Sequence, residues 1–141
     1  MPRGLALLAL LGCGACTIDV GVAPDAGPCP ASPDFFVSDV FPFYLQANQC
    51  NSAGCHAFED GHGTLRLRTP GLAPVPGTPL EQWPFDWREN YLSALQLVRC
   101  DDPSQSRLLT VPEGQSNLHP PGPVVLDRAS ARMIITTWVT P

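Results

Sequence analysis

The chain has 141 residues, of which 13 are acidic and eight are basic, so its formal net charge is −5 at neutral pH. All eight basic residues are scattered arginines, and without a basic cluster to neutralise a phosphate backbone we expect no nucleic-acid partner. The 17 prolines and 12 glycines exclude long regular elements, and the length leaves room for one small domain with one modest core.

Residues 1–12 hold one arginine followed by a short run of leucine and alanine, and Cys13 comes directly after them. This pattern indicates a secretory signal, and the run is too short to span a bilayer permanently. The four residues that end at Cys13, Leu-Leu-Gly-Cys, resemble a bacterial lipobox, which implies that Cys13 is lipidated. Cys16 is a competing lipidation site, and an ordinary signal peptide is the alternative. In each case we expect an exported protein; the lipobox places it in the cell envelope, bound to the inner or outer membrane.

Residues 13–34 are small, rich in proline and glycine, and without periodicity. Such a segment buries too little apolar surface to order itself, so we expect a flexible tether. The folded domain is then expected to span residues 35–141.

Apolar residues recur at helical spacing just after residue 35 and predict a short helix that leads into Cys50. Ser38 and Asp39 are the expected caps, and Pro42 is expected only in a first turn. The apolar positions are Val37, Val40, Phe41 and Tyr44.

Glycine and proline recur between residues 61 and 84, where only residues 64–68 alternate as a brief extended segment should. A second helix is predicted over residues 86–98, opened by a capping box from Asp86 to Glu89. Its apolar face is Trp87, Tyr91, Leu95 and Val98.

The third and clearest helix is predicted over residues 127–139, with Asp127 as its cap. We expect a mainly α fold of three or so short helices with long loops, in which the terminal helices cross. Met133 and the three tryptophans are expected in the core. The residues expected to pack where the terminal helices cross are Val40, Phe41, Tyr44, Ile134, Ile135 and Trp138.

The stretch with the clearest chemistry begins at Cys50 and ends with Cys55 and His56. Covalent haem attachment needs two thiols that add to the vinyl groups of one porphyrin, and a histidine directly after the second thiol that reaches the iron. The usual pattern has two residues between the cysteines, whereas four lie between them here. Gly54 is expected to let this longer loop fold back.

The domain as a whole resembles the small cytochrome c-like modules of exported bacterial proteins. In that family a helix ends at the cysteines and a series of short motifs follows it. This chain has similar motifs in the same order. The resemblance implies a cytochrome c-like fold with covalent haem c and a role in electron transfer rather than enzymatic catalysis. The matching pieces are Gly63–Leu67, Asp102–Leu109, His119–Gly122 and Trp138-Val139.

The resemblance also implies the iron ligands. His56 would be the proximal ligand, and His119 stands where the family has a distal methionine, so we expect His119 as the distal ligand. Exchanging a thioether for an imidazole favours ferric iron. His62 is expected at the surface. The redox partner is not identified by the sequence, and a monomer is expected.

Two alternatives stay open. Exported cysteines usually form disulfides, and a bridge from Cys100 to Cys50 or Cys55 would abolish haem attachment and leave a structural or binding surface lipoprotein. With haem attached, two of Cys16, Cys29 and Cys100 could pair instead. A zinc site from Cys50, Cys55, His56 and His119 is the other alternative. No order of serine, histidine and aspartate indicates an enzyme.

Overall fold

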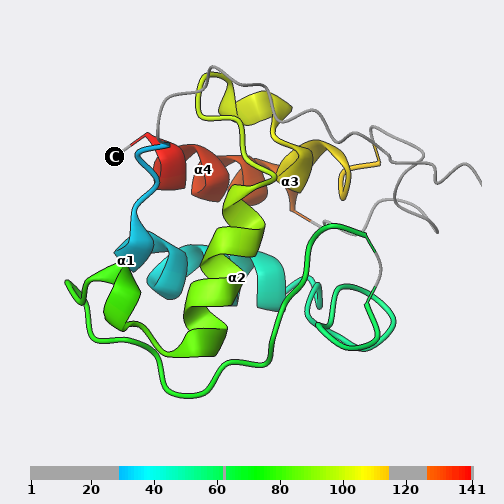
Figure 1. The fold of residues 1–141 in the computed structure, drawn as a ribbon. Coiled ribbons are helices and arrows are strands. Elements are labelled where there is room, and N and C mark those ends of the chain that lie inside the picture. Colours follow the sequence, from blue (N-terminus) through cyan, green and yellow to red (C-terminus); the bar gives the residue numbers. More distant parts are fainter. Residues whose placement is uncertain (1–28, 62, 115–126, 141) are drawn as a thin grey trace, which may run out of the picture.

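The computed structural model describes residues 29–61, 63–114 and 127–140, and within them the chain is helical and without strands. Figure 1 shows the helices packed together with long loops between them. The expected mainly α class is therefore confirmed. In chain order the elements are α1 (Pro33–Phe35), η1 (Phe36–Gln46), η2 (Leu80–Gln82), α2 (Phe85–Leu95), η3 (Pro103–Gln105), α3 (Arg107–Thr110) and α4 (Arg128–Val139).

The first helical segment begins earlier than predicted, because Ser32 caps it. The Ser32 hydroxyl accepts a hydrogen bond from the Phe35 backbone N–H at 3.2 Å, whereas Ser38 and Asp39 bond to each other, so the predicted caps are wrong. Pro42 lies inside η1, which is a π-helix. Its wider turns, bonded from residue i to i−5, relieve the clash of a proline ring with the carbonyl four residues earlier.

The described part of the chain packs into the fold from Cys29 onward, ahead of the expected boundary at residue 35. Cys29 is joined to Cys100 by a disulfide, and the Tyr91 hydroxyl donates to the Ala31 carbonyl at 2.9 Å. Ala31 is buried. Residues 29–34 are therefore part of the fold.

Helix α2 confirms a helix in the predicted region, but its capping box is wrong. The helix begins at Phe85 behind Pro84, whose fixed φ suits a helix start, and no side chain caps it. Its buried face includes Trp87 and Tyr91, as predicted, together with Asn90.

Helix α4 begins as predicted, since the Asp127 side chain accepts a hydrogen bond from the Ser130 N–H at 3.1 Å. Ile135 and Trp138 are fully buried, and Ile134 packs partly against the core. Met133 is 64% exposed, so its expected place in the core is wrong: the buried stripe of α4 consists of Ala131, Ile135, Trp138 and Val139.

The core forms where η1 packs against α4. The Phe36 ring lies 5.4 Å from Trp138 between centroids, and Tyr91 of α2 lies 5.4 Å from Phe36 and 5.9 Å from Trp138. The Trp138 indole N–H donates to the Ser32 carbonyl at 3.0 Å. All three tryptophans are buried, as expected, and so are Val40, Phe41 and Tyr44.

The predicted extended segment forms no strand in the described residues, but side chains of α2 hold its backbone through hydrogen bonds. Leu65 and Leu67 are buried, and Leu67 forms an isolated parallel bridge with Ala57. The fully buried Asn90 amide accepts from the Arg68 N–H at 2.7 Å and donates to the Arg68 carbonyl at 3.0 Å. Asn90 thus satisfies both backbone groups of one residue, as a neighbouring strand would.

Candidate functional site

Residues 50–56, named the attachment loop here, fold back on themselves directly after η1. The Cys50 N–H donates to the Leu45 carbonyl at 2.8 Å, and the His56 N–H donates to the Cys50 carbonyl at 3.0 Å. Gly54 has φ of 79°, in the left-handed region that favours glycine. The expected role of Gly54 in closing this longer loop is confirmed, and the loop brings the backbone of His56 next to that of Cys50.

The two thiols of the attachment loop are both free but differ in exposure. Cys50 is 7% exposed, whereas Cys55 is exposed to solvent. Burial raises the pKa of the Cys50 thiol to about 11, and the nearby Cys55 adds to that increase. Cys50 is therefore protonated at neutral pH.

This difference predicts an order of chemical modification. At pH near 7, iodoacetamide is expected to alkylate Cys55 well before Cys50, because only an accessible thiolate reacts. Mass spectrometry of peptides from briefly treated protein measures both rates. Treatment in denaturant is the control and should remove the difference. Equal rates in the folded protein would contradict the burial of Cys50.

Backbone contacts of neighbouring residues hold His56 in place. The His56 carbonyl accepts from the Leu67 N–H at 2.8 Å, which ties it to the extended segment. Gly61 packs so tightly over the residues after His56 that a Cβ there would lie 2.3 Å from the Ala57 carbonyl oxygen. A Cβ on Gly63 would lie 3.8 Å from Cε1 of His56. The loop around His56 is therefore closely packed.

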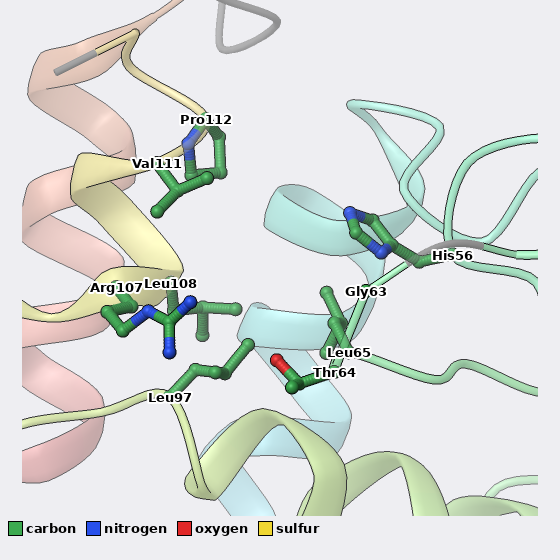
Figure 2. A pocket seen from close by; sticks show the side chains of 9 residues that line it. All are labelled: His56, Gly63, Thr64, Leu65, Leu97, Arg107, Leu108, Val111 and Pro112. Atoms are coloured by element: carbon green, nitrogen blue, oxygen red, sulfur yellow. The ribbon is translucent and has the colours of Figure 1, made fainter. Parts of the chain in front are cut away.

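His56 lines a pocket, shown in Figure 2, with a volume of about 90 Å³. The opposite wall comes from Leu97, just after α2, and from α3 with the residues after it. Most of the lining is apolar, which disfavours water. The lining residues are His56, Gly63, Thr64, Leu65, Leu97, Arg107, Leu108, Val111 and Pro112.

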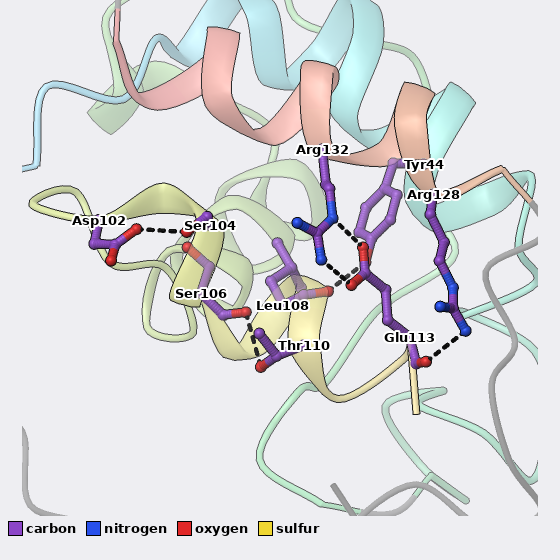
Figure 3. A network of polar contacts seen from close by, with 9 residues as sticks. All are labelled: Tyr44, Asp102, Ser104, Ser106, Leu108, Thr110, Glu113, Arg128 and Arg132. Carbon is purple, nitrogen blue, oxygen red and sulfur yellow. Dashed lines mark hydrogen bonds and ion pairs between the residues drawn. The ribbon is translucent and has the colours of Figure 1, made fainter. Parts of the chain in front are cut away.

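A buried polar network behind the pocket holds α3 in place (Figure 3). The Glu113 carboxylate is 2% exposed and takes two hydrogen bonds from Arg132 of α4, at 2.9 and 2.6 Å. Arg128 donates to the Glu113 carbonyl at 3.0 Å, and the Tyr44 hydroxyl donates to the Leu108 carbonyl. Burial raises the pKa of Tyr44 above its ordinary value, so this hydroxyl stays a donor. The network joins the pocket wall to both terminal helices.

The chemistry of these residues fits covalent haem. Two free thiols in one loop, a histidine directly after the second and an apolar wall are the groups that such a haem needs. The pocket volume is smaller than the roughly 300–1,000 Å³ usual for cofactor sites, so one edge of a porphyrin would enter it and the rest would extend outside.

The structure separates the sequence-predicted site residues into two groups. Cys50, Cys55 and His56 lie together, and Cys100 pairs with Cys29, one of the pairings left open, and not with either loop cysteine. Cys13, Cys16, His62 and His119 lie outside the described residues.

Sequence reasoning missed Arg107 and Glu113. Arg107 lies in the matched Asp-Pro-x-x-Ser-x-Leu-Leu piece at a variable position, so no local signal marks it. Glu113 follows a proline in a turn-rich stretch, which is typical of a solvated charge. Only the packing of α3 on α4 shows that Glu113 is buried.

Among residues 29–61, 63–114 and 127–140, no three histidine, cysteine, aspartate or glutamate side chains gather closely enough to hold a metal ion. Cys50, Cys55 and His56 therefore do not converge as zinc ligands in this structure. The helices in the same residues include none long and apolar enough to cross a membrane. No protein-family model, curated protein or solved structure matches the chain.

Proposed function

We propose that this chain is a membrane-anchored, cytochrome c-like electron-transfer protein, with haem attached to Cys50 and Cys55 and His56 as the proximal iron ligand. The observation that carries the proposal is the division of the cysteines. Cys100 is held by Cys29, which leaves the two loop thiols free beside a histidine that lines an apolar pocket.

Each part of the site has a role in this function. The attachment loop holds two thiols and one imidazole on one short stretch of backbone, through the hydrogen bond from His56 to the Cys50 carbonyl. The apolar wall of Leu65, Leu97 and Leu108 excludes water from one side. Haem, when bound, supplies a one-electron couple at its iron, whose potential depends on the axial ligands and on burial.

Two further parts of the proposal rest on the sequence. His119 is the proposed distal ligand, which would give a bis-histidine iron of low potential. Lipidation of Cys13 would hold the domain near the membrane and raise the effective concentration of membrane-bound redox partners. Both follow from the resemblance and from the lipobox.

Covalent haem is testable in a host that matures c-type cytochromes. The wild-type chain is expected to give a haem-stained band on a denaturing gel and a c-type absorption spectrum, because thioether bonds survive denaturation. The Cys50→Ala/Cys55→Ala chain is expected to give neither. A ferric methionine–iron charge-transfer band would contradict His119 as the distal ligand while leaving covalent haem intact.

The second candidate function is a haem-free surface lipoprotein, a structural or binding protein stabilised by its disulfide. The Cys29–Cys100 bridge is the observation that favours it, since disulfides stabilise small exported domains. A colourless wild-type protein from the maturing host, with this bridge intact by mass spectrometry, would support this second function and rule out the first.

A further inference from the structure

Arg107 is the one lining residue of the pocket with a permanent charge. It is the first residue of α3, and its side chain is shown with the apolar residues Leu97 and Leu108 in Figure 2. No carboxylate is among the nine lining residues. Within the described residues, Arg107 makes no ion pair and its side chain donates no hydrogen bond. Its guanidinium is thus available to a bound molecule.

Three other arginines of the domain, unlike Arg107, have a carboxylate nearby. Arg132 is paired with Glu113, Arg99 with Asp101, and Arg68 lies 3.8 Å from Asp86. The chain also carries a net charge of −5, so carboxylates are plentiful, yet none of the described ones reaches Arg107. An unpaired guanidinium beside an apolar wall favours an apolar molecule that carries an anionic group.

A carboxylate is the anion that suits this place. The planar guanidinium can donate two parallel hydrogen bonds to one carboxylate, and such charge-assisted bonds are about twice as strong as neutral ones. Arg107 is exposed, so a carboxylate can reach it from solvent, and the buried Leu108 beside it offers an apolar surface. The pocket volume of about 90 Å³ takes only the edge of a large molecule, which is where a carboxylate side arm would be.

We infer that Arg107 binds a carboxylate of the porphyrin, so that this pocket selects a porphyrin edge bearing a free propionate. The inference rests on the proposed function for the identity of the ligand. Arg107 then acts beside the attachment loop: the loop fixes the porphyrin covalently, and Arg107 sets which edge enters the pocket.

The test uses the full-length Cys50→Ala/Cys55→Ala chain, in which binding is reversible. Its affinities for iron protoporphyrin and for the dimethyl ester, whose propionates are uncharged, are measured by absorption titration. The parent chain is expected to bind the free acid about tenfold more tightly than the ester, since one charge-assisted hydrogen bond is lost. Adding Arg107→Gln to this parent chain is expected to remove the preference for the free acid over the ester.

Arg88→Gln is the matched control, because it removes the same charge from α2 at a residue that does not line the pocket, and it should keep the preference. A preference retained in Arg107→Gln, no preference in the parent, or no binding of either porphyrin would overturn the inference. If the wild-type chain nevertheless carries covalent haem, only the role of Arg107 fails. A colourless wild-type chain from the maturing host means that the proposed function fails.

Discussion

Replacing Cys29 and Cys100 together by serine is expected to lower the free energy of unfolding by about 4 kcal/mol. The bridge joins residues 71 apart in sequence, and opening so long a loop returns much conformational entropy to the unfolded chain. Such a loss is a large part of the roughly 5–15 kcal/mol that stabilises a typical domain. Urea unfolding followed by tryptophan fluorescence measures it, since all three tryptophans are buried.

Cys55→Ser is the control for this experiment. Cys55 is an exposed free cysteine, so its replacement is expected to change the stability by about 0.5 kcal/mol or less. All three chains are compared without haem, because Cys55→Ser would otherwise also remove an attachment point. If the double variant unfolds at the same urea concentration as the wild type, residues 29–34 are not anchored as described. The Cys29–Cys100 bridge is also expected to protect haem attachment. Without Cys29, Cys100 becomes a free thiol that can pair with Cys50 or Cys55. Cys29→Ser alone should therefore lose more covalent haem than the double variant does.

Helical periodicity and cap chemistry predicted much of the fold. The three main helices lie where their patterns indicated, and Asp127 caps α4. The sequence did not predict Pro42 inside a helix. The rule that proline interrupts a helix beyond its first turn was derived for the α-helix, whereas η1 is a π-helix. The expected position of Met133 was wrong because it lies two positions from both Ala131 and Ile135, which puts it on the opposite face of the helix.

For the candidate site, the local sequence predicted the attachment loop, but it did not predict contacts between distant segments. The attachment loop is contiguous, so its three functional residues and Gly54 could all be identified from order alone. The partner of Cys100 could not, since cysteine spacing leaves several connectivities open. Arg107 owes its place in the pocket to α3 packing opposite the attachment loop, a contact between segments far apart in the chain.

The fold depends most on Trp138, and Trp138→Ala is expected to lower the free energy of unfolding by about 3–5 kcal/mol. The side chain is fully buried, and its ring contacts those of Phe36 and Tyr91, so it links η1, α2 and α4. Removing it leaves a large cavity and takes away one of the two hydrogen bonds that the Ser32 carbonyl accepts. Urea unfolding followed by circular dichroism measures the loss without relying on tryptophan fluorescence.

Met133→Ala is the matched control, because it also shortens a large apolar side chain of α4, but one that is 64% exposed. Met133→Ala is expected to lower the free energy of unfolding by about 0.5 kcal/mol or less. Trp138→Phe should fall between the two, since the phenyl ring keeps most of the packing and loses the hydrogen bond to Ser32, which is worth about 1 kcal/mol. A cost for Met133→Ala as large as that for Trp138→Ala would mean that α4 is rotated about its axis. The pocket would then change as well, because Arg132 would no longer face Glu113 and α3 would lose its support.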